Sequence, residues 1–215
     1  MATSSERWIK LWQEIDAKDD GLVVYQELLS LYSEPHRHYH NLRHISDCLD
    51  EFEFGRELAK EPLAVELAIW FHDAIYETRA SDNEENSAEL AKKRISEAGG
   101  DLQLCASVCA LVMATKTHDA LLHPDAPLMV DVDLSILGKP DDRFWEYEAQ
   151  IRQEYEWVPE EIFAVKRAEI LERFLMRNRI FSTEAFFDRY EEQSRRNVQA
   201  SVKKLKSRGI TPLKQ

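Results

Sequence analysis

The 215-residue sequence is poor in the residues that make turns, with only six glycines and seven prolines. An all-β fold needs frequent turns, and glycine and proline supply most of them. Their scarcity argues against such a fold. Cysteine is also rare, and Cys48, Cys105 and Cys109 form no CxxC pair. We expect buried thiols rather than a disulfide framework or a closed cysteine zinc site.

The sequence also lacks a long apolar run and an excess of basic residues. No apolar stretch is long enough to span a membrane, and the N-terminal residues lack the apolar core of a signal peptide. We therefore expect a cytoplasmic protein with no membrane partner. The 28 Lys and Arg residues against 40 Asp and Glu give a formal net charge of -12, which argues against general nucleic-acid binding. The net charge does not exclude a small phosphorylated ligand that binds in a local pocket.

The periodicity of the apolar residues is helical nearly everywhere, which predicts an all-α fold. We interpret residues 1–206 as a single domain, either monomeric or homodimeric, followed by a flexible tail at 207–215. Within it we expect a site in about residues 36–138, with C-terminal helices over 141–206 packing on it. The expected helices before that C-terminal group are 5–15, 21–32, 41–52, 62–76, 83–100, 102–118 and a short helix before Gly138.

The segment EPHRHYHNLRHI, residues 34–45, contains more than half of the seven histidines of the chain. Histidine is the commonest metal ligand in proteins. The four histidines are His36, His38, His40 and His44. A histidine-rich loop is also common on surfaces, so its meaning depends on ligand-type residues elsewhere. We expect His36 and His38 to be loop residues outside any site.

Ligand-type residues do occur elsewhere, within apolar segments. His72 and Asp73 interrupt the apolar run 62–76, and Asp131 and Asp133 interrupt LMVDVDLSIL. A buried carboxylate without a partner costs roughly several kcal/mol, so each is expected to be paired or bound to a cation. Lys116 and His118 end another apolar helix. Histidine and aspartate gathered inside a helical bundle indicate a divalent metal site for Mn, Fe, Mg, Ni or Zn.

The order of these residues resembles the HD-domain superfamily of metal-dependent phosphohydrolases, which are all-helical proteins named for the His-Asp doublet. The segments PHRHYHNLRHI, WFHDAIYE, NEENSA, ATKTH and DVDLSILG are similar to a bacterial subfamily of predicted HD phosphohydrolases. The resemblance covers residues 32–197 and implies a single-domain HD-type helical bundle. It implies metal ligands at His40, His72, Asp73 and Asp133, with Asp131 as the alternative to Asp133.

The resemblance also implies hydrolysis of a phosphomonoester or phosphodiester, such as a nucleotide, by a metal-activated water. Four further residues are expected beside the ligands, as substrate contacts or as acid–base groups, and His118 could also bind a second metal ion. They are Arg43, His44, Lys116 and His118. Glu77 is either a general base or an ordinary exposed glutamate, and Glu84 is either a site residue or a favourable helix-terminal charge.

No motif selects the substrate. The doublet is followed by AIYE rather than ED, and the chain has no GYP tripeptide, which weighs against alarmones and cyclic dinucleotides. Two other classes of protein compete with a phosphohydrolase. One is a metal-containing protein that binds or senses a nucleotide without turnover, and the other is a helical scaffold with no site.

Overall fold

The computed structural model describes residues 3–118 and 121–209, and every regular element in these two ranges is helical. The predicted all-α class is thereby confirmed. The predicted tail begins too early, because the last helix extends to Gly209. The rest of the predicted tail lies outside the described residues.

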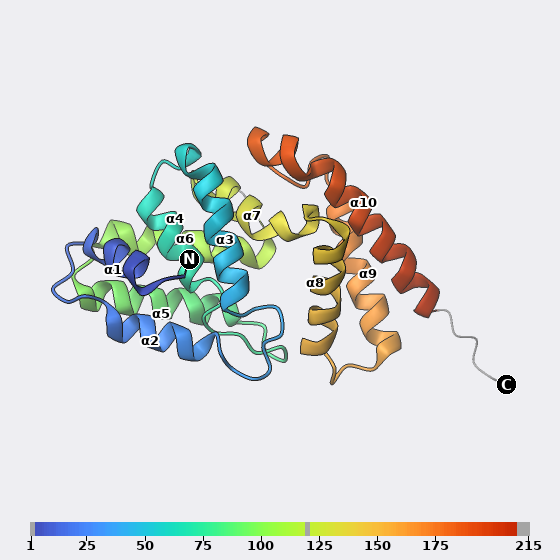
Figure 1. Cartoon of the computed structure of the whole chain (residues 1–215), viewed down its shortest axis with the longest axis horizontal. Coiled ribbons are helices and arrows are strands. Elements are labelled where there is room, and N and C mark those ends of the chain that lie inside the picture. The colour runs from blue at the N-terminus through green and yellow to red at the C-terminus, as the bar shows by residue number, and fades with distance from the viewer. Residues whose placement is uncertain (1–2, 119–120, 210–215) are drawn as a thin grey trace. The chain divides into compact units, whose positions relative to one another are not determined.

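The chain divides into two compact units, an N-terminal unit of Met1–Asp133 and a C-terminal unit of Leu134–Gln215 (Figure 1). The predicted division between a site-bearing part and C-terminal helices falls close to this boundary. That the two units form a single domain stays a prediction. All the residues singled out for metal or substrate chemistry belong to the N-terminal unit.

The N-terminal unit contains the elements from α1 to α7. They are α1 (Ser5–Gln13), α2 (Leu22–Leu31), α3 (Leu42–Gly55), η1 (Arg56–Leu58), α4 (Pro62–Phe71), α5 (Asn83–Ala98), α6 (Leu102–Thr117) and α7 (Ala126–Leu134).

Helix α4 is the central element of this unit, as its apolar sequence predicts. Pro62 begins it, where the missing amide hydrogen costs nothing. Every side chain from Ala64 to Phe71 is buried, and α4 packs against α1, α3, α5 and α6. The ring of Trp70 meets that of Trp8 edge to face at 5.2 Å between centroids. Burial of each large apolar side chain stabilises the fold by about 1.5–3 kcal/mol.

The prediction of one helix over 62–76 is wrong beyond Phe71, where α4 ends. His72 is the C-terminal cap, and Asp73 lies in the turn that follows. Side chains from elsewhere bind the backbone of this turn in place of helical hydrogen bonds. Arg37 donates to the carbonyls of Asp73 and Ala74, and the Ser87 hydroxyl contacts the amide and carbonyl of Ile75. Such tertiary contacts override the helical preference of the local sequence.

The C-terminal unit consists of η2 (Ser135–Gly138), α8 (Asp141–Glu154), α9 (Glu160–Met176) and α10 (Glu184–Gly209). The side-chain amide of Asn197 on α10 donates to the carbonyls of Leu137 and Lys139, at 2.8 Å each. Between α8 and α9, the buried guanidinium of Arg167 binds the Glu148 carboxylate at 2.6 Å. Both of these polar side chains are thus paired inside this unit.

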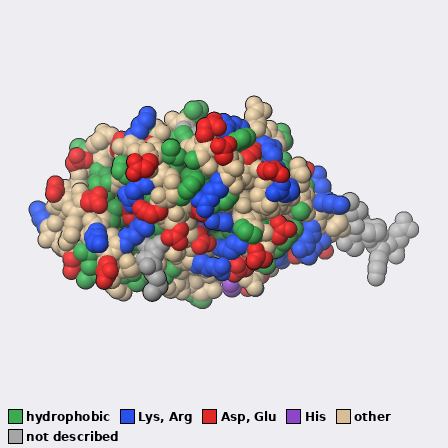
Figure 2. Space-filling view, turned by 45° about the horizontal axis from the view of Figure 1, so that its top comes forward, with side chains coloured by type: hydrophobic (Ala, Val, Ile, Leu, Met, Phe, Trp, Pro, Cys, Tyr) green, Lys and Arg blue, Asp and Glu red, His purple; other side chains and the backbone are tan. Residues whose placement is uncertain are grey.

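The molecular surface carries charges of both signs. On the face in Figure 2, acidic and basic side chains are interspersed and no large patch has a single sign. Among the described residues, no helix is long and apolar enough to cross a membrane.

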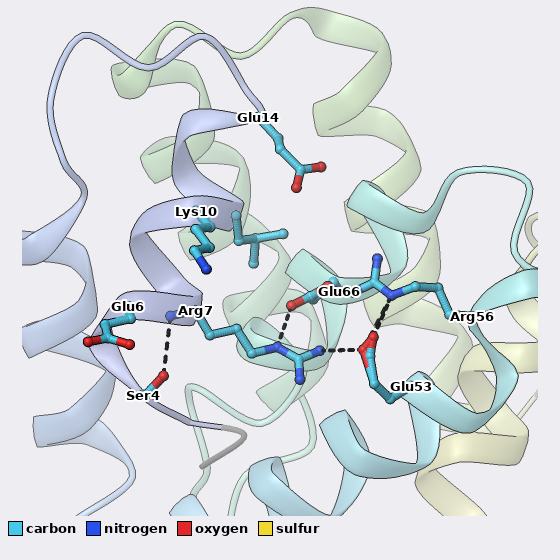
Figure 3. Close-up of a pocket in the computed structure, with 9 residues that line it drawn as sticks. Ser4, Glu6, Arg7, Lys10, Glu14, Glu53, Arg56 and Glu66 are labelled. Carbon is cyan, nitrogen blue, oxygen red and sulfur yellow. Dashed lines mark hydrogen bonds and ion pairs between the residues drawn. The ribbon is translucent and has the colours of Figure 1, made fainter.

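A pocket of about 500 Å³ lies among α1, α3, η1 and α4 (Figure 3). Glu66 extends into it, and its carboxylate is 5% exposed. Two arginines bind this carboxylate, Arg7 through Nε at 2.7 Å and Arg56 through its guanidinium. Among the described residues, no histidine lines the pocket, and both arginines of the lining are paired with Glu66. We interpret it as part of the packing of α1 on α4.

We predict that Glu66→Gln lowers the free energy of unfolding of the N-terminal unit by about 2 kcal/mol, because two arginines lose a buried charged acceptor. The matched control is Glu53→Gln, since Glu53 contacts the same arginines but is 48% exposed. Its cost is expected to be below about 1 kcal/mol. Urea unfolding followed by circular dichroism measures both, and equal losses would contradict the central role of Glu66.

Candidate metal centre

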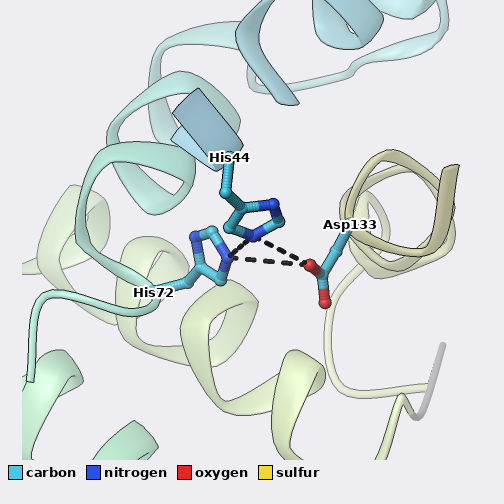
Figure 4. A group of neighbouring side chains, drawn as sticks. All are labelled: His44, His72 and Asp133. Atoms are coloured by element: carbon cyan, nitrogen blue, oxygen red, sulfur yellow. Dashed lines mark hydrogen bonds and ion pairs between the residues drawn. The ribbon is translucent and has the colours of Figure 1, made fainter. Parts of the chain in front are cut away.

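Three side chains from separate elements converge in the N-terminal unit, and Figure 4 shows them pointing toward one another. His44 comes from the first turn of α3, His72 from the end of α4, and Asp133 from α7. The Nε2 atoms of the two histidines are 3.1 Å apart. Oδ1 of Asp133 is 3.3 Å from Nε2 of His44 and 3.7 Å from Nε2 of His72.

These spacings match those of donors around one metal ion. Bonds of about 2.1 Å to nitrogen and oxygen place neighbouring donors roughly 3.0–3.4 Å apart in octahedral or tetrahedral geometry. The three donor atoms already stand close to this separation. The set of two imidazoles and a carboxylate, without cysteine, fits Mn, Fe, Ni, Zn or Mg.

Asp73 adds a second carboxylate to the group. Its Oδ2 is 3.1 Å from Nε2 of His72 and 3.4 Å from Nε2 of His44. Both members of the predicted doublet therefore lie at the group, at a helix end rather than inside a helix. Asp73 is outside the set of three side chains whose ligand atoms all lie within 4.8 Å of one another. Two carboxylates thus flank the two facing imidazole nitrogens.

The hydrogen bond of His72 fixes which of its nitrogens faces the group. Nδ1 lies 2.9 Å from the carbonyl oxygen of Ile69, which can only accept, so Nδ1 carries a hydrogen. In the neutral ring, Nε2 then directs its lone pair at His44 and the carboxylates. Such a backbone contact is the usual way in which proteins orient a metal-binding histidine.

The electrostatics of the group favour positive charge. Burial raises the pKa of Asp133, but hydrogen bonds from His118, His44 and His72 hold it well below its usual value. Burial likewise opposes ionisation of Asp73, and the nearby histidines, His72 above all, hold its pKa well below normal.

The pKa values of the two buried histidines move in the opposite direction. Burial lowers the pKa of His72, yet Asp73 and Asp133 raise it well above the usual value. For His44, burial also lowers the pKa, but Cys48 and Tyr39, and after them Asp133 and Asp73, raise it well above its usual value. The metal-free group therefore holds protons, which a bound cation would replace.

The group has a buried side and an accessible side. The side chains of His44 and His72 are 2% and 1% exposed, whereas those of Asp73 and Asp133 are 18% and 16% exposed. His118 lies at the accessible side, 25% exposed, with its Nε2 3.3 Å from Oδ2 of Asp133. Solvent and a ligand can thus reach the carboxylates, while the histidines form the wall behind them.

His44, rather than His40, belongs to the group of three side chains. His40 lies one turn earlier, and its ring stacks on that of Tyr76 with centroids 4.2 Å apart. Its ring centroid is 5.9 Å from that of His44. Ligation by His40, which the resemblance implies, stays a prediction, and the described geometry supports His44 in that role.

The other histidines of the tract are placed outside the group. His36 donates from Nε2 to the carbonyl of Tyr76 at 2.9 Å, and His38 is exposed. Asp133, rather than the fully buried Asp131, belongs to the group of three.

The predicted substrate contacts are only partly gathered at the site. Lys116 donates to the Ser81 carbonyl at 2.7 Å and to the Glu85 carboxylate at 2.5 Å, and its Nζ is 3.8 Å from Glu84. Its charge is thereby engaged by acidic neighbours, which also gives Glu84 an electrostatic role.

Glu77 and Arg43 are both exposed, so their predicted roles stay predictions. Glu77 follows the end of α4, not one turn along the same helix as expected from the sequence.

Sequence reasoning did not single out Arg37, whose buried guanidinium donates to the carbonyl of Asp73 at 2.6 Å. It lies between two histidines in a polar tract, where burial is not expected. The signal that the sequence offers is two aromatic residues near Arg37, Tyr32 just before this tract and Tyr39 within it.

Comparisons of the chain with protein-family models, with curated proteins and with solved structures found no match. Any function proposed for the site therefore rests on the geometry of the site and on the resemblance of its motifs.

We predict that His44→Ala weakens Mn²⁺ binding by more than about 100-fold, since even residues that only orient ligands contribute about 10- to 100-fold. His40→Ala is expected to weaken it by less than about tenfold, because its ring packs on Tyr76. Isothermal titration of both variants, with the exposed His38→Ala as control, measures this difference. The reverse order of effects would assign the ligand to His40.

Proposed function

We propose that this chain is a metal-dependent phosphohydrolase whose ion is held by His44, His72, Asp73 and Asp133. The observation that carries the proposal is the convergence of two buried imidazole nitrogens, 3.1 Å apart, with two carboxylates. Such a group is stable only when positive charge lies within it. A divalent cation supplies that charge in a form that both histidines and both carboxylates can share.

The histidines and the carboxylates of the group differ in burial, and we assign them different roles for that reason. The two histidines are inaccessible and hold their side of the site rigid, with His72 oriented by the Ile69 carbonyl. The two carboxylates balance the charge of a divalent ion and face the accessible side. A metal bound here would lower the pKa of a coordinated water from 15.7 toward about 7 and so supply a nucleophile at neutral pH.

A phosphate ester as substrate is supported by the ordered resemblance to HD phosphohydrolases. The group lies within the segments that carry this resemblance, with His44 in the first, the doublet in the second and Asp133 in the last. His118, beside Asp133 at the accessible side, is placed to contact a phosphoryl oxygen or to orient that carboxylate. The expected substrates are phosphomonoesters or phosphodiesters, nucleotides among them.

We expect the purified protein to hydrolyse p-nitrophenyl phosphate, bis(p-nitrophenyl) phosphate or members of a nucleotide panel when supplied with Mn²⁺, Fe²⁺, Ni²⁺, Mg²⁺ or Zn²⁺. A chelator should abolish turnover. Asp73→Asn should lower kcat/KM by at least about 100-fold, a typical contribution of one reacting group. The control is Asp50→Asn, which changes an exposed carboxylate of α3.

Two results would count against hydrolysis. Equal activity of the wild type and Asp73→Asn would remove the assigned site from the reaction. A protein that binds metal and nucleotides but turns over no phosphate ester, with any of the five ions, would instead be a metal-containing nucleotide-binding protein. Thermal-shift measurements with the same nucleotide panel detect that binding.

A further inference from the structure

Arg37 is the most enclosed cation near the metal centre, and its side chain has no exposed surface. It belongs to the segment between α2 and α3, within the histidine tract. The rings of Tyr32 and Tyr76 lie 5.2 and 5.5 Å from its guanidinium carbon. A buried guanidinium is costly unless its donors are satisfied, so its partners show what the residue does.

Those partners are backbone carbonyls of the two segments that carry the predicted ligands. Nη1 donates to the carbonyl of His40 at 3.1 Å and to that of Asp73 at 2.6 Å. Nη2 donates to the carbonyl of Ala74 at 2.8 Å. Nε donates to the carboxylate of Glu34 at 2.9 Å, which balances the charge.

One planar group therefore joins the start of α3 to the turn after α4. The His40 carbonyl directly precedes Asn41, the N-terminal cap of α3, and His44 lies in the first turn of that helix. On the other side, the guanidinium binds the peptide of Asp73 itself. Arg37 thus links the backbone that carries His44 to the backbone of the doublet, in addition to the packing of α3 on α4.

We propose that Arg37 is the positioning residue of this metal centre, an inference that rests on the proposed function. It touches neither the metal nor the substrate. It holds the backbone of α3 and of the doublet at the separation at which His44, His72 and Asp73 share one ion. Ligand sets need to be held within about 0.5 Å of their working geometry, and a rigid guanidinium with several fixed donors provides this.

Lysine cannot replace arginine in this role. Its ammonium is a compact charge on a flexible stem, whereas the guanidinium offers five donors in one rigid plane. The carbonyls of His40, Asp73 and Ala74 are bound by two nitrogens of that plane. The charge alone would be preserved in Arg37→Lys, and the geometry would not.

The test compares Arg37→Met with Arg167→Met. Arg167 is a matched control because its side chain is 10% exposed, it pairs with Glu148, and its guanidinium carbon is also 5.2 Å from a tyrosine ring, that of Tyr147. Arg167 belongs to the C-terminal unit. Both variants should lower the melting temperature of the metal-free protein.

Only Arg37→Met should raise the Kd for Mn²⁺, by about 10- to 100-fold, as expected for a residue that orients ligands. It should also alter the visible absorption spectrum of the Co²⁺-substituted protein, which reports ligand geometry and is insensitive to general stability. Arg37→Lys, measured in the same way, should show a raised Kd for Mn²⁺ and an altered Co²⁺ spectrum. This second variant keeps the test valid if Arg37→Met does not fold.

A folded Arg37→Lys or Arg37→Met variant with the Kd and Co²⁺ spectrum of the wild type would overturn the positioning role alone. Equal losses of Mn²⁺ affinity in the Arg37 and Arg167 variants would also overturn it, since the effect would then be one of stability. A wild type that binds neither Mn²⁺ nor Co²⁺ would overturn the metal centre itself, and that result is distinguishable from the other two.

Discussion

Two histidine nitrogens that face each other at 3.1 Å in a buried place, between two carboxylates, impose a strong electrostatic condition on this structure. Two buried imidazoles and two partly exposed carboxylates so close together favour positive charge among them. Burial acts to lower the pKa of both histidines, but their neighbours hold it well above its usual value in the metal-free protein. In the proposed function, a divalent cation would supply that charge.

The fold satisfies this condition by ending helices at the site. The buried helix α4 anchors the unit, and beyond its end at Phe71 side chains from other segments bind the Asp73 carbonyl and the Ile75 amide. His72 can then turn its Nδ1 to the Ile69 carbonyl and its Nε2 to the centre. His118 likewise follows the end of α6 with a left-handed backbone, φ 50°. At a helix end the backbone can turn, so a side chain there can point in a direction that a continuous helix would not allow.

Much of this arrangement could be predicted from the sequence, because apolar periodicity reports burial and buried polar residues report chemistry. The helices, the central α4 and the gathering of His72 and Asp73 with the pair Asp131 and Asp133 follow from those two signals, whereas Asp133 as the ligand is what the family resemblance implies. The end of α4 at Phe71 could not be predicted, since long-range hydrogen bonds cause it. The choice between His40 and His44 could not be predicted either, because residues one turn apart share a helical face and only tertiary packing distinguishes them.

The most direct measurement is the metal content of the untagged wild-type protein and of Asp133→Asn, both purified without chelator and analysed for Mn, Fe, Ni, Zn and Mg. The substitution keeps the shape of the side chain and removes one of the charges that the cation balances. We expect near-stoichiometric metal in the wild type and little in the variant, with both proteins equally helical by circular dichroism. Absence of metal from the wild type, even after reconstitution with each ion, would contradict the central claim.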